Sequence, residues 1–389
     1  MIRSGASRHR TPRHHPNLQQ GTCLIPWVVY RVDRTNKKES MSFMTSAAEP
    51  GEQTQTKNSR AWVQALSKYR EPLAWRSLFE LSVTLLPFVA LWALAWWALA
   101  LSGWLALAIA VVNGGFLVRI FAIQHDCGHG AFFRNRKLSD WIGRGLGVLT
   151  LTPYDVWRRT HSVHHASAGN LDKRGMGDVM TLTVAEYRAM GWSGKLRYRL
   201  YRNPVVLFGL GPVYLFLLQN RLPLGLFRSG WTYWASAMAT NVVIALILGL
   251  IVFFGGLKVL LLVFLPTSIM AASIGVWLFY VQHQFEETHW RDGEEWDLHD
   301  AALAGSSHYD LPMILRWFTA NLGIHHVHHL YSRIPFYRLP EVLRDHRELA
   351  LAQRMTIWQS FACVKLQLWD EKQRRLLSVA QARKLYGAL

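Results

Sequence analysis

Charged residues are scarce in this chain of 389 residues. Asp, Glu, Lys and Arg make up 17% of it and apolar residues 51%, whereas a soluble globular domain usually carries about 25% charged residues. Much of the surface is therefore expected not to face water. This composition excludes a disordered protein and a basic tail that binds nucleic acid, so we expect no nucleic-acid partner.

Acidic residues and cysteines are scarcer still. The chain has 25 acidic residues against 43 Lys and Arg, for a net charge of +18. A basic balance in an apolar chain favours a membrane protein whose cations gather on one side. The three cysteines, Cys23, Cys127 and Cys363, are too few and too scattered for a disulfide framework. Residues 1–32 contain no acidic residue and no apolar core of signal length, so we expect no signal peptide.

Residues 1–60 differ from the rest of the chain. They are rich in Arg, His, Ser and Gln, and they show no hydrophobic period. We interpret them as a disordered basic leader. Met41 and Met44 leave open an over-extended gene start, and a targeting peptide is a weaker alternative because no amphipathic Arg face is visible. The main domain is predicted over residues 61–375, followed by a C-terminal tail over residues 376–389.

Four apolar runs indicate helices that span a membrane. They cover residues 78–101, 104–124, 231–255 and 259–282, and each has about the 20 residues needed to cross the hydrocarbon layer as a helix. Very short turns join the first run to the second and the third to the fourth, which predicts two hairpins. A fifth apolar stretch, residues 205–220, is short and contains Pro212, so we expect an interfacial or re-entrant helix there.

The positions of the cations predict the orientation. All but two of the 43 Lys and Arg lie in residues 1–77, 134–204, 221–228 and 282–389, and the two exceptions are Arg119 and Lys258. An even number of spans puts both termini on one side, and the positive-inside rule makes that side cytoplasmic. We therefore expect an all-α integral protein of the inner membrane, with four transmembrane helices, interfacial helices and a cytoplasmic cap that carries the histidines.

Histidine, by contrast, is abundant and clustered. The first cluster is H-x3-H, and the second and third are H-x2-H-H, the third with His326 inserted. On a helix, side chains three and four residues apart lie on one face, so each cluster can point several imidazoles at a metal. Eight imidazoles exceed the four ligands of one zinc and suit two metal ions, but imidazole also binds Cu, Fe and Ni. The eight are His125, His129, His161, His164, His165, His325, His328 and His329.

Further residues are weaker candidates for the same site. His283 directly follows the fourth apolar run and is a candidate ninth ligand. Metal-bound histidines usually pass their second N–H to a carboxylate or carbonyl, and four residues near the clusters could accept it: Asp126, Asp155, Asp172 and Asn321. For each of these four, ordinary loop capping is the alternative.

The three histidine motifs in this order, with two hydrophobic hairpins around them, resemble the membrane fatty acid desaturases over roughly residues 60–375. Bacterial acyl-lipid desaturases are the most similar group. Further resembling stretches are residues 169–175, 201–204, 275–283, 305–312 and 368–371.

The resemblance implies that the eight histidines hold two irons, with His283 at a further ligand position. It implies an enzyme that uses O2 and two electrons to place a cis double bond in the acyl chain of a membrane lipid. No H-P-G-G haem motif is present, so the electron donor is expected to be a separate protein, either ferredoxin-like or cytochrome b5-like. The first choice for the position of the double bond is Δ12 (ω-6), with Δ5 and Δ9 as alternatives.

Two other readings stay open from the sequence. Membrane hydroxylases, alkane monooxygenases and carotenoid ketolases share the histidine design. A metal transporter or haem protein would place its polar ligands within the spans, where this chain has mainly Leu, Ala, Val and Trp. The oligomeric state has no sequence signal.

Overall fold

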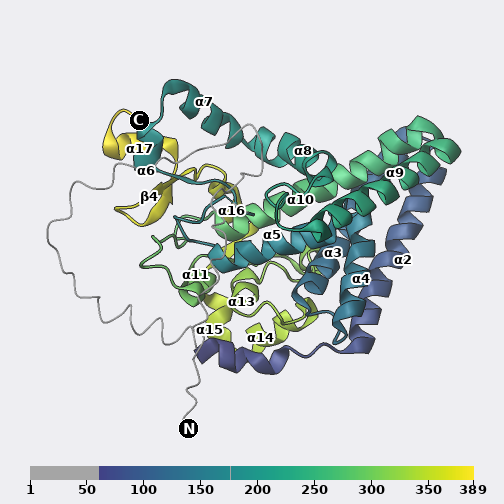
Figure 1. Cartoon of the computed structure of the whole chain (residues 1–389), viewed down its shortest axis with the longest axis horizontal. Coiled ribbons are helices and arrows are strands. Elements are labelled where there is room, and N and C mark those ends of the chain that lie inside the picture. Colours follow the sequence, from purple (N-terminus) through teal and green to yellow (C-terminus); the bar gives the residue numbers. More distant parts are fainter. Residues whose placement is uncertain (1–60, 176) are drawn as a thin grey trace, which may run out of the picture.

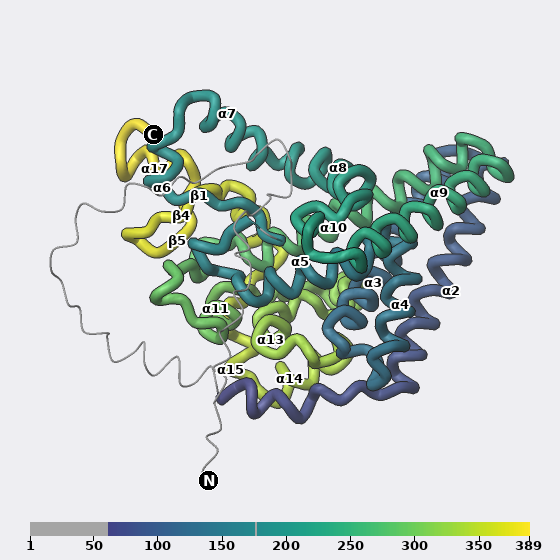
Figure 2. The backbone as a smooth tube through the Cα atoms, viewed as in Figure 1, coloured from purple at the N-terminus to yellow at the C-terminus, as the bar shows by residue number. Residues whose placement is uncertain are grey.

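The computed structural model describes residues 61–389 except residue 176, so the predicted leader lies outside the described residues. Long helices gather on one side of the molecule, and short helices and strands form the other side (Figure 1). The tube view shows the C-terminal segments in the region of short elements, far from the tips of the long helices (Figure 2). We call this region the cap: residues 168–190 and 284–389.

The first two long helices are α2 (Ala74–Ala98) and α3 (Gly103–His129). Both are long and apolar enough to cross a membrane. Helix α3 continues past the end of the predicted span and stops at Gly130, whose φ of 68° is the left-handed conformation that commonly ends helices. This extra turn places the first histidine motif on the same rigid helix as the apolar span.

The third long apolar stretch runs from Trp231 to His283 over 53 residues. It consists of α9 (Trp231–Val259), the π-helical turn η4 (Leu260–Phe264) and α10 (Leu265–His283). Gly256, with φ 69° and ψ −178°, interrupts the helix inside the turn that the sequence predicts. By length and apolarity, three helices among the described residues could cross a membrane. The membrane character agrees with the prediction, and the division into four spans stays a prediction.

Shorter helices connect the long ones. Helices α4 (Arg136–Leu149) and α5 (Tyr154–Ser167) lie between α3 and α9 in the sequence. Helix α7 (Trp192–Tyr201) and the stretch from Val206 to Arg221 make an angle of 58°. That stretch comprises η2 (Val206–Leu210), α8 (Gly211–Leu217) and η3 (Gln219–Arg221), and it covers the residues predicted as an interfacial or re-entrant helix.

Two small sheets hold the cap together. In the first, β1 (Leu182–Thr183) pairs in parallel with β4 (Leu368–Asp370), which pairs antiparallel with β5 (Arg375–Leu377). In the second, β2 (His308–Asp310) pairs in parallel with β3 (Arg354–Thr356). The remaining cap elements are α6 (Val184–Ala189), α11 (Leu298–Ala304), α12 (Met313–Phe318), α13 (His325–Leu330), η5 (Phe336–Arg338), α14 (Leu339–Asp345), α15 (Arg347–Leu351), α16 (Ile357–Cys363) and α17 (Val379–Tyr386), and η1 (Ser67–Tyr69) precedes α2.

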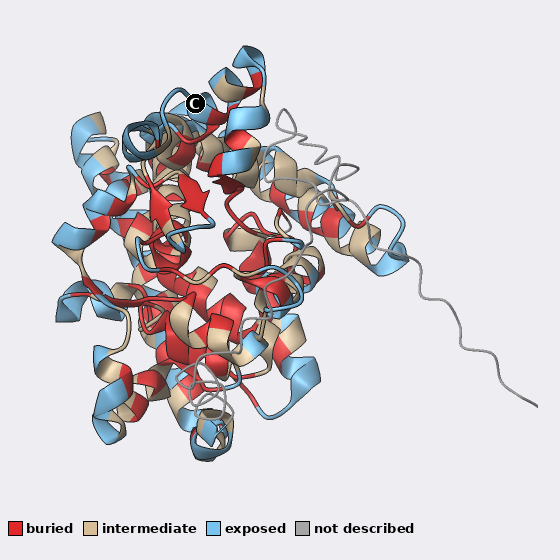
Figure 3. Cartoon of the chain, turned by 90° about the vertical axis from the view of Figure 1, so that its left-hand side faces the viewer, coloured by how far each residue is buried: buried red, intermediate tan, exposed pale blue. Residues whose placement is uncertain are grey.

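The buried residues concentrate in the middle of the molecule (Figure 3). Residues 376–389, predicted as a tail, contribute the end of β5 and α17, and Leu376, Leu377 and Ala382 are buried there. By contrast, many Leu, Val, Phe and Trp side chains on the long helices are exposed, such as Leu86 (70%) and Phe253 (80%). Apolar side chains on the outside are expected where lipid, not water, surrounds a helix.

Candidate metal centre

Four helices carry the nine histidines that the sequence singles out. Helix α3 ends on the first motif, α5 contains the second, His283 is the last residue of α10, and α13 is formed almost entirely by the third motif. The three motifs and His283 thus come from segments far apart in the chain. The structure brings all nine side chains together as two groups.

Cluster A consists of five histidines: His125, His129, His161, His165 and His328. The Nε2 atoms of His161 and His129 are 3.1 Å apart, as are those of His165 and His161. The Nε2 atoms of His328 and His165 are 3.2 Å apart. All the ligand atoms of this group lie within 4.8 Å of one another.

Cluster B consists of four histidines: His164, His283, His325 and His329. Nε2 of His164 lies 3.2 Å from that of His283 and 3.3 Å from that of His329. Nε2 of His325 lies 3.0 Å from that of His283. The two clusters adjoin, because the rings of His165 and His329 stack with centroids 4.1 Å apart.

These distances suit ligands of a metal ion. With metal–nitrogen bonds of about 2.1 Å and angles between tetrahedral and right angles, two ligand nitrogens are about 3.0–3.4 Å apart. The Nε2 pairs quoted above fall at 3.0 to 3.3 Å. The nitrogens of each cluster are therefore spaced as the ligands of one metal ion would be, and the two clusters fit the sequence interpretation of two ions.

In two histidines of cluster B, a hydrogen bond at Nδ1 fixes the direction in which Nε2 points. Nδ1 of His164 lies 2.5 Å from Oδ1 of Asp178, and Nδ1 of His283 lies 3.2 Å from the carbonyl oxygen of Gly305. Because both partners are acceptors, each ring carries its proton on Nδ1 and directs the Nε2 lone pair into cluster B. This arrangement is the usual one for metal-bound histidines.

Burial keeps the imidazoles in the form that binds metals. It holds the pKa of five of the histidines well below the ordinary value of 6.5, namely His161, His165, His325, His328 and His329. Neighbouring imidazoles lower these pKa values further, because two charged rings would repel each other. At neutral pH these rings are uncharged, and only the neutral ring offers a lone pair to a metal.

The predicted supporting residues lie in different places. Oδ1 of Asp126 is 3.4 Å from Nδ1 of His125, and its other oxygen accepts the backbone N–H of Phe336. Asp172 accepts the backbone N–H of Gly293. Asn321 has a φ of 56° and donates its side-chain N–H to the carbonyl of Phe336, which is a turn-stabilising contact.

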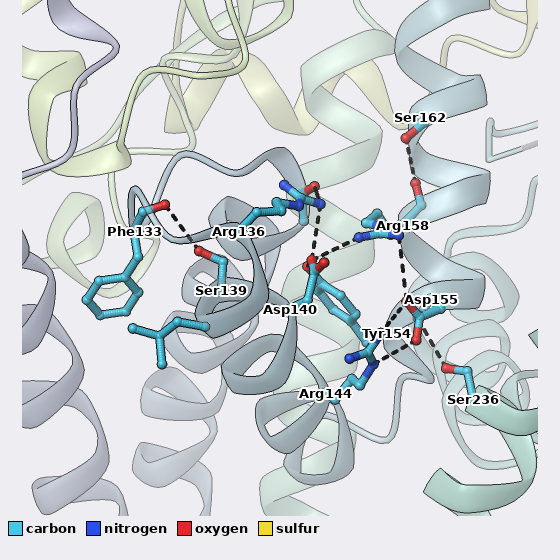
Figure 4. Close-up of polar contacts among 12 residues, drawn as sticks. Phe133, Arg136, Ser139, Asp140, Arg144, Tyr154, Asp155, Arg158, Ser162 and Ser236 are labelled. Carbon is cyan, nitrogen blue, oxygen red and sulfur yellow. Dashed lines mark hydrogen bonds and ion pairs between the residues drawn. The ribbon is translucent and has the colours of Figure 1, made fainter. Parts of the chain in front are cut away.

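The fourth predicted supporting residue, Asp155, belongs to a network between α4 and α5 (Figure 4). Its carboxylate accepts two hydrogen bonds from Arg144, at 2.9 and 3.2 Å. In the same network, Asp140 pairs with Arg136 and Arg158. These contacts hold the two helices side by side, so Asp155 supports the position of α5.

Asp178 is the supporting residue that sequence reasoning missed. It lies 14 residues after its partner His164, in a loop that also contains three Gly, Asp172, Lys173 and Arg174. The sequence offered Asp172 in the same loop, and nothing in the spacing separates the two aspartates. Asp178 is buried. Which of the two aspartates reaches His164 depends on how the loop folds back over α5, and the sequence does not record this.

The inserted His326 lies outside both clusters. It is fully buried, and its Nε2 lies 2.8 Å from the carbonyl oxygen of Leu349. Its ring lies next to that of His308, whose Nδ1 lies 2.8 Å from the carbonyl oxygen of Ala350. His326 therefore holds α13 against α15, and His308 holds β2 against the same helix.

Comparison with known proteins identifies the family. The family model for fatty acid desaturases matches residues 102–361. A fatty acid desaturase of Bacillus subtilis is 41% identical over 328 residues, which is 84% of this chain and 92% of that protein. The chain belongs to the fatty acid desaturase family. This desaturase is therefore an oxidoreductase that acts on fatty acids, and the transporter and haem-protein readings fall away.

More distant relatives carry more specific names. An sn-1 acyl-lipid omega-3 desaturase (ferredoxin) of Synechocystis is 31% identical over 59% of this chain and 64% of that protein. An sn-1 oleoyl-lipid 12-desaturase of Arthrospira platensis is 23% identical over 66% of this chain and 73% of that protein. Their names differ in the position of the double bond, so membership of the family leaves that position open.

Proposed function

We propose that this desaturase introduces a cis double bond into an acyl chain of a membrane lipid, with clusters A and B each holding one iron. The observation that carries the proposal is the convergence of nine imidazoles as two adjoining groups, each with its ligand atoms within 4.8 Å of one another. An iron pair would supply the oxidation of two adjacent methylenes, which have no acidic proton for a side-chain base to remove. The balance takes up O2, two electrons and two protons, and it releases two molecules of water.

The residues of this chain would prepare the site for that chemistry. His125, His129, His161, His165 and His328 would hold one metal, and His164, His283, His325 and His329 the other. Asp178 and the Gly305 carbonyl would fix the ring orientations of His164 and His283. Burial would limit the access of water to cluster B, where His164, His283 and His325 are buried.

The ligand assignment is tested by removing single imidazoles. His161→Ala and His328→Ala are expected to abolish the unsaturated product while the protein stays in the membrane. His299→Ala is the matched control, since His299 lies outside both clusters and contacts Asp297. If either ligand variant kept near-normal conversion, the assignment at that motif would be wrong.

The position of the double bond is proposed as Δ12 (ω-6), with Δ5 and Δ9 as the alternatives. The 12-desaturase among the relatives supports the first choice. Expression in a host that lacks polyunsaturated lipids, followed by location of the new double bonds, decides among them. A new bond only at the ω-3 position, as in the name of the Synechocystis relative, would reject all three.

Hydroxylation is the second candidate reaction, because membrane hydroxylases and ketolases share the histidine design. The mass of the product distinguishes the two. Desaturation removes two hydrogens from the acyl chain, whereas hydroxylation adds one oxygen. A hydroxylated chain as the main product would replace the proposal.

For the electron donor we propose a separate ferredoxin-like protein, with a cytochrome b5-like protein as the alternative. Three of the relatives are named as ferredoxin enzymes. The cationic residues near the clusters, Arg134, Arg136, Lys137, Arg158 and Arg159, would attract an acidic donor. Anionic lipid headgroups are the other explanation of these charges. A steep fall of the electron-transfer rate with salt supports donor attraction, and a flat response removes it.

We further propose that the protein lies in the inner membrane with both termini and the metal site on the cytoplasmic side. The distribution of Lys and Arg supports this orientation. Reporter tags at residue 389 and in the predicted turn at residues 256–258 test it. Labelling of the first tag from outside intact cells would overturn the orientation.

A further inference from the structure

A short segment of the cap, just before the third histidine motif, forms a loop whose two ends meet. Its two ends are joined, because His308 and Ile324 form an antiparallel bridge and the N–H of Tyr309 donates to the carbonyl of Gly323 at 2.7 Å. Between these ends lies α12, a helix of six residues. After it, Ala320 and Asn321 adopt positive φ values of 49° and 56°, which reverses the chain sharply. Residues 308–324 therefore form a loop that is closed at its base.

This loop packs against the middle of α3, one of the long apolar helices. The ring of Phe318 packs so closely on Gly115 of α3 that a Cβ there would lie 3.0 Å from it. The rings of Phe116 and Trp317 lie 5.8 Å apart. Gly115 is ten residues before His125 on α3, which is about 15 Å along a helix. This distance places α12 well inside the apolar part of the span.

Five of the six side chains of α12 are apolar, and the sixth, Arg316, is exposed together with most of them. No residue of this helix is buried. Met313 is 76% exposed and Ile314 67%, and Leu315 and Trp317 are 45% and 37% exposed. At the surface of a water-soluble region such a run would be costly, but at this depth the surroundings are hydrocarbon.

A buried ion pair inside the first two long helices faces this segment. Arg119 of α3 and Glu80 of α2 are each 2% exposed and pair with each other. The same guanidinium donates to the backbone carbonyl of Trp317 and lies 4.0 Å from the centre of the Trp317 ring. Carbonyls at the end of a helix need a partner when no water is near, and charged groups at membrane depth mark a special role.

We infer that residues 308–324 form a re-entrant segment, that the exposed face of α12 contacts lipid acyl chains, and that the Glu80–Arg119 pair anchors it to the spans. On α3, one helical turn before the contacts of Gly115 and Phe116 with α12, Val112 is 56% exposed. Lipid is therefore the occupant that the surroundings supply. The third histidine motif begins one residue after this segment ends, so the anchor also fixes one end of α13.

Accessibility of spin labels to two quenchers tests the lipid contact. Single labels are placed at Met313 and Ile314 of the full-length protein in lipid nanodiscs. The background carries Cys23→Ser, and the other two cysteines are buried. A label at Val112 on α3 represents lipid, and a label at the exposed Glu294 represents water. Molecular oxygen concentrates in lipid and a nickel chelate in water.

The expected result is that both α12 labels follow the Val112 label, with high oxygen and low nickel collision rates. Nickel access equal to that at Glu294 would overturn the inference. Protection from both quenchers would overturn it as well, because it would show that protein, such as a second copy of the chain, covers α12. Neither readout depends on the metal or on enzyme activity.

The anchor is tested with the label kept at Ile314. Arg119→Lys keeps the charge but loses the planar fork that reaches both Glu80 and the Trp317 carbonyl. Glu80→Gln leaves the arginine without its counter-charge. Both are expected to raise nickel access several-fold. Arg76→Gln is the matched control, since Arg76 pairs with Glu80 at 2.7 Å and is itself 38% exposed. If nickel access at Ile314 is unchanged in both variants, Arg119 and Glu80 do not anchor the segment.

Discussion

Clusters A and B are built from the same two helical motifs but differ in burial. Three of the four histidines of cluster B, His164, His283 and His325, are buried, whereas in cluster A three of the five, His129, His161 and His165, are only partly buried. Helix α5 gives two histidines to cluster A and one to cluster B, and α13 does the reverse. Cluster B is therefore shielded from solvent more than cluster A is.

The hydrogen bonds that orient the histidine rings are also shorter in cluster B than in cluster A. In cluster B, Asp178 holds His164 at 2.5 Å and the Gly305 carbonyl holds His283 at 3.2 Å. In cluster A, the contact between Asp126 and His125 is longer, at 3.4 Å. Ligands whose orientation is fixed in advance bind metal more tightly. We therefore expect cluster B to hold its iron more firmly and cluster A to be the side that reactants reach.

The largest effect is expected from a pair of neighbouring substitutions in α5, His164→Ala in cluster B and His165→Ala in cluster A. Both should abolish the product. If the clusters are separate metal sites, each variant should retain one of the two irons, measured as iron per chain in the purified protein. Complete iron loss in both variants would show that the clusters form one inseparable unit.

Asp178→Asn is expected to weaken iron binding at cluster B by roughly 10–100-fold, the usual cost of losing such a supporting group. Asn cannot accept the imidazole proton as strongly as a carboxylate does. Asp126→Asn should cost less, because its contact with His125 is longer. Chelator competition measures both. Equal losses would contradict the difference in support between the clusters.

Gly128→Ala is expected to disturb cluster A by a smaller amount. An added Cβ would lie 2.7 Å from the ring of Trp157, which stacks on His161 with centroids 4.7 Å apart. Overpacking of this kind costs about 1–3 kcal/mol, and it should appear as easier iron loss from cluster A alone. Gly145→Ala is the control, since nothing lies within 4 Å of the added Cβ. Equal iron loss in the two variants would show that packing on Trp157 does not support cluster A.

The smallest effect concerns His289, which lines a small cavity together with Asp178 and His283. Burial, helped by Arg291, lowers the pKa of His289 to about 4. Below pH 6.5 the unfolded chain therefore binds a proton that the folded chain does not. Stability should fall as pH drops from 6.5 towards 4, by at most about 1.4 kcal/mol per pH unit from this group.

His289→Gln should remove that share of the pH dependence. Unfolding midpoints of the wild type and the variant at pH 7 and pH 5.5 provide the measurement. A variant whose midpoint shifts with pH as much as the wild type would show that His289 is not shielded on the cluster B side.

The division of histidines between the clusters was only partly predictable. Spacing of three and four residues predicted ligands on one face of each helix, and the structure does bring every predicted ligand together. The sequence interpretation put the three members of each H-x2-H-H motif on one stripe. In the structure the first and last members serve one cluster and the middle member the other, because the residues at i and i+3 diverge enough to face two different centres.

Local pattern determined much of this protein without any knowledge of the fold. Apolar runs of spanning length, and histidines at helical spacing, depend only on residues that are neighbours in the chain, so the apolar long helices and the nine candidate ligands were visible in the sequence. The tertiary structure alone decided the rest. The roles of Asp178, of the Glu80–Arg119 pair and of α12 depend on contacts between segments from 14 to 198 residues apart, and no local period records which distant segment a side chain will meet.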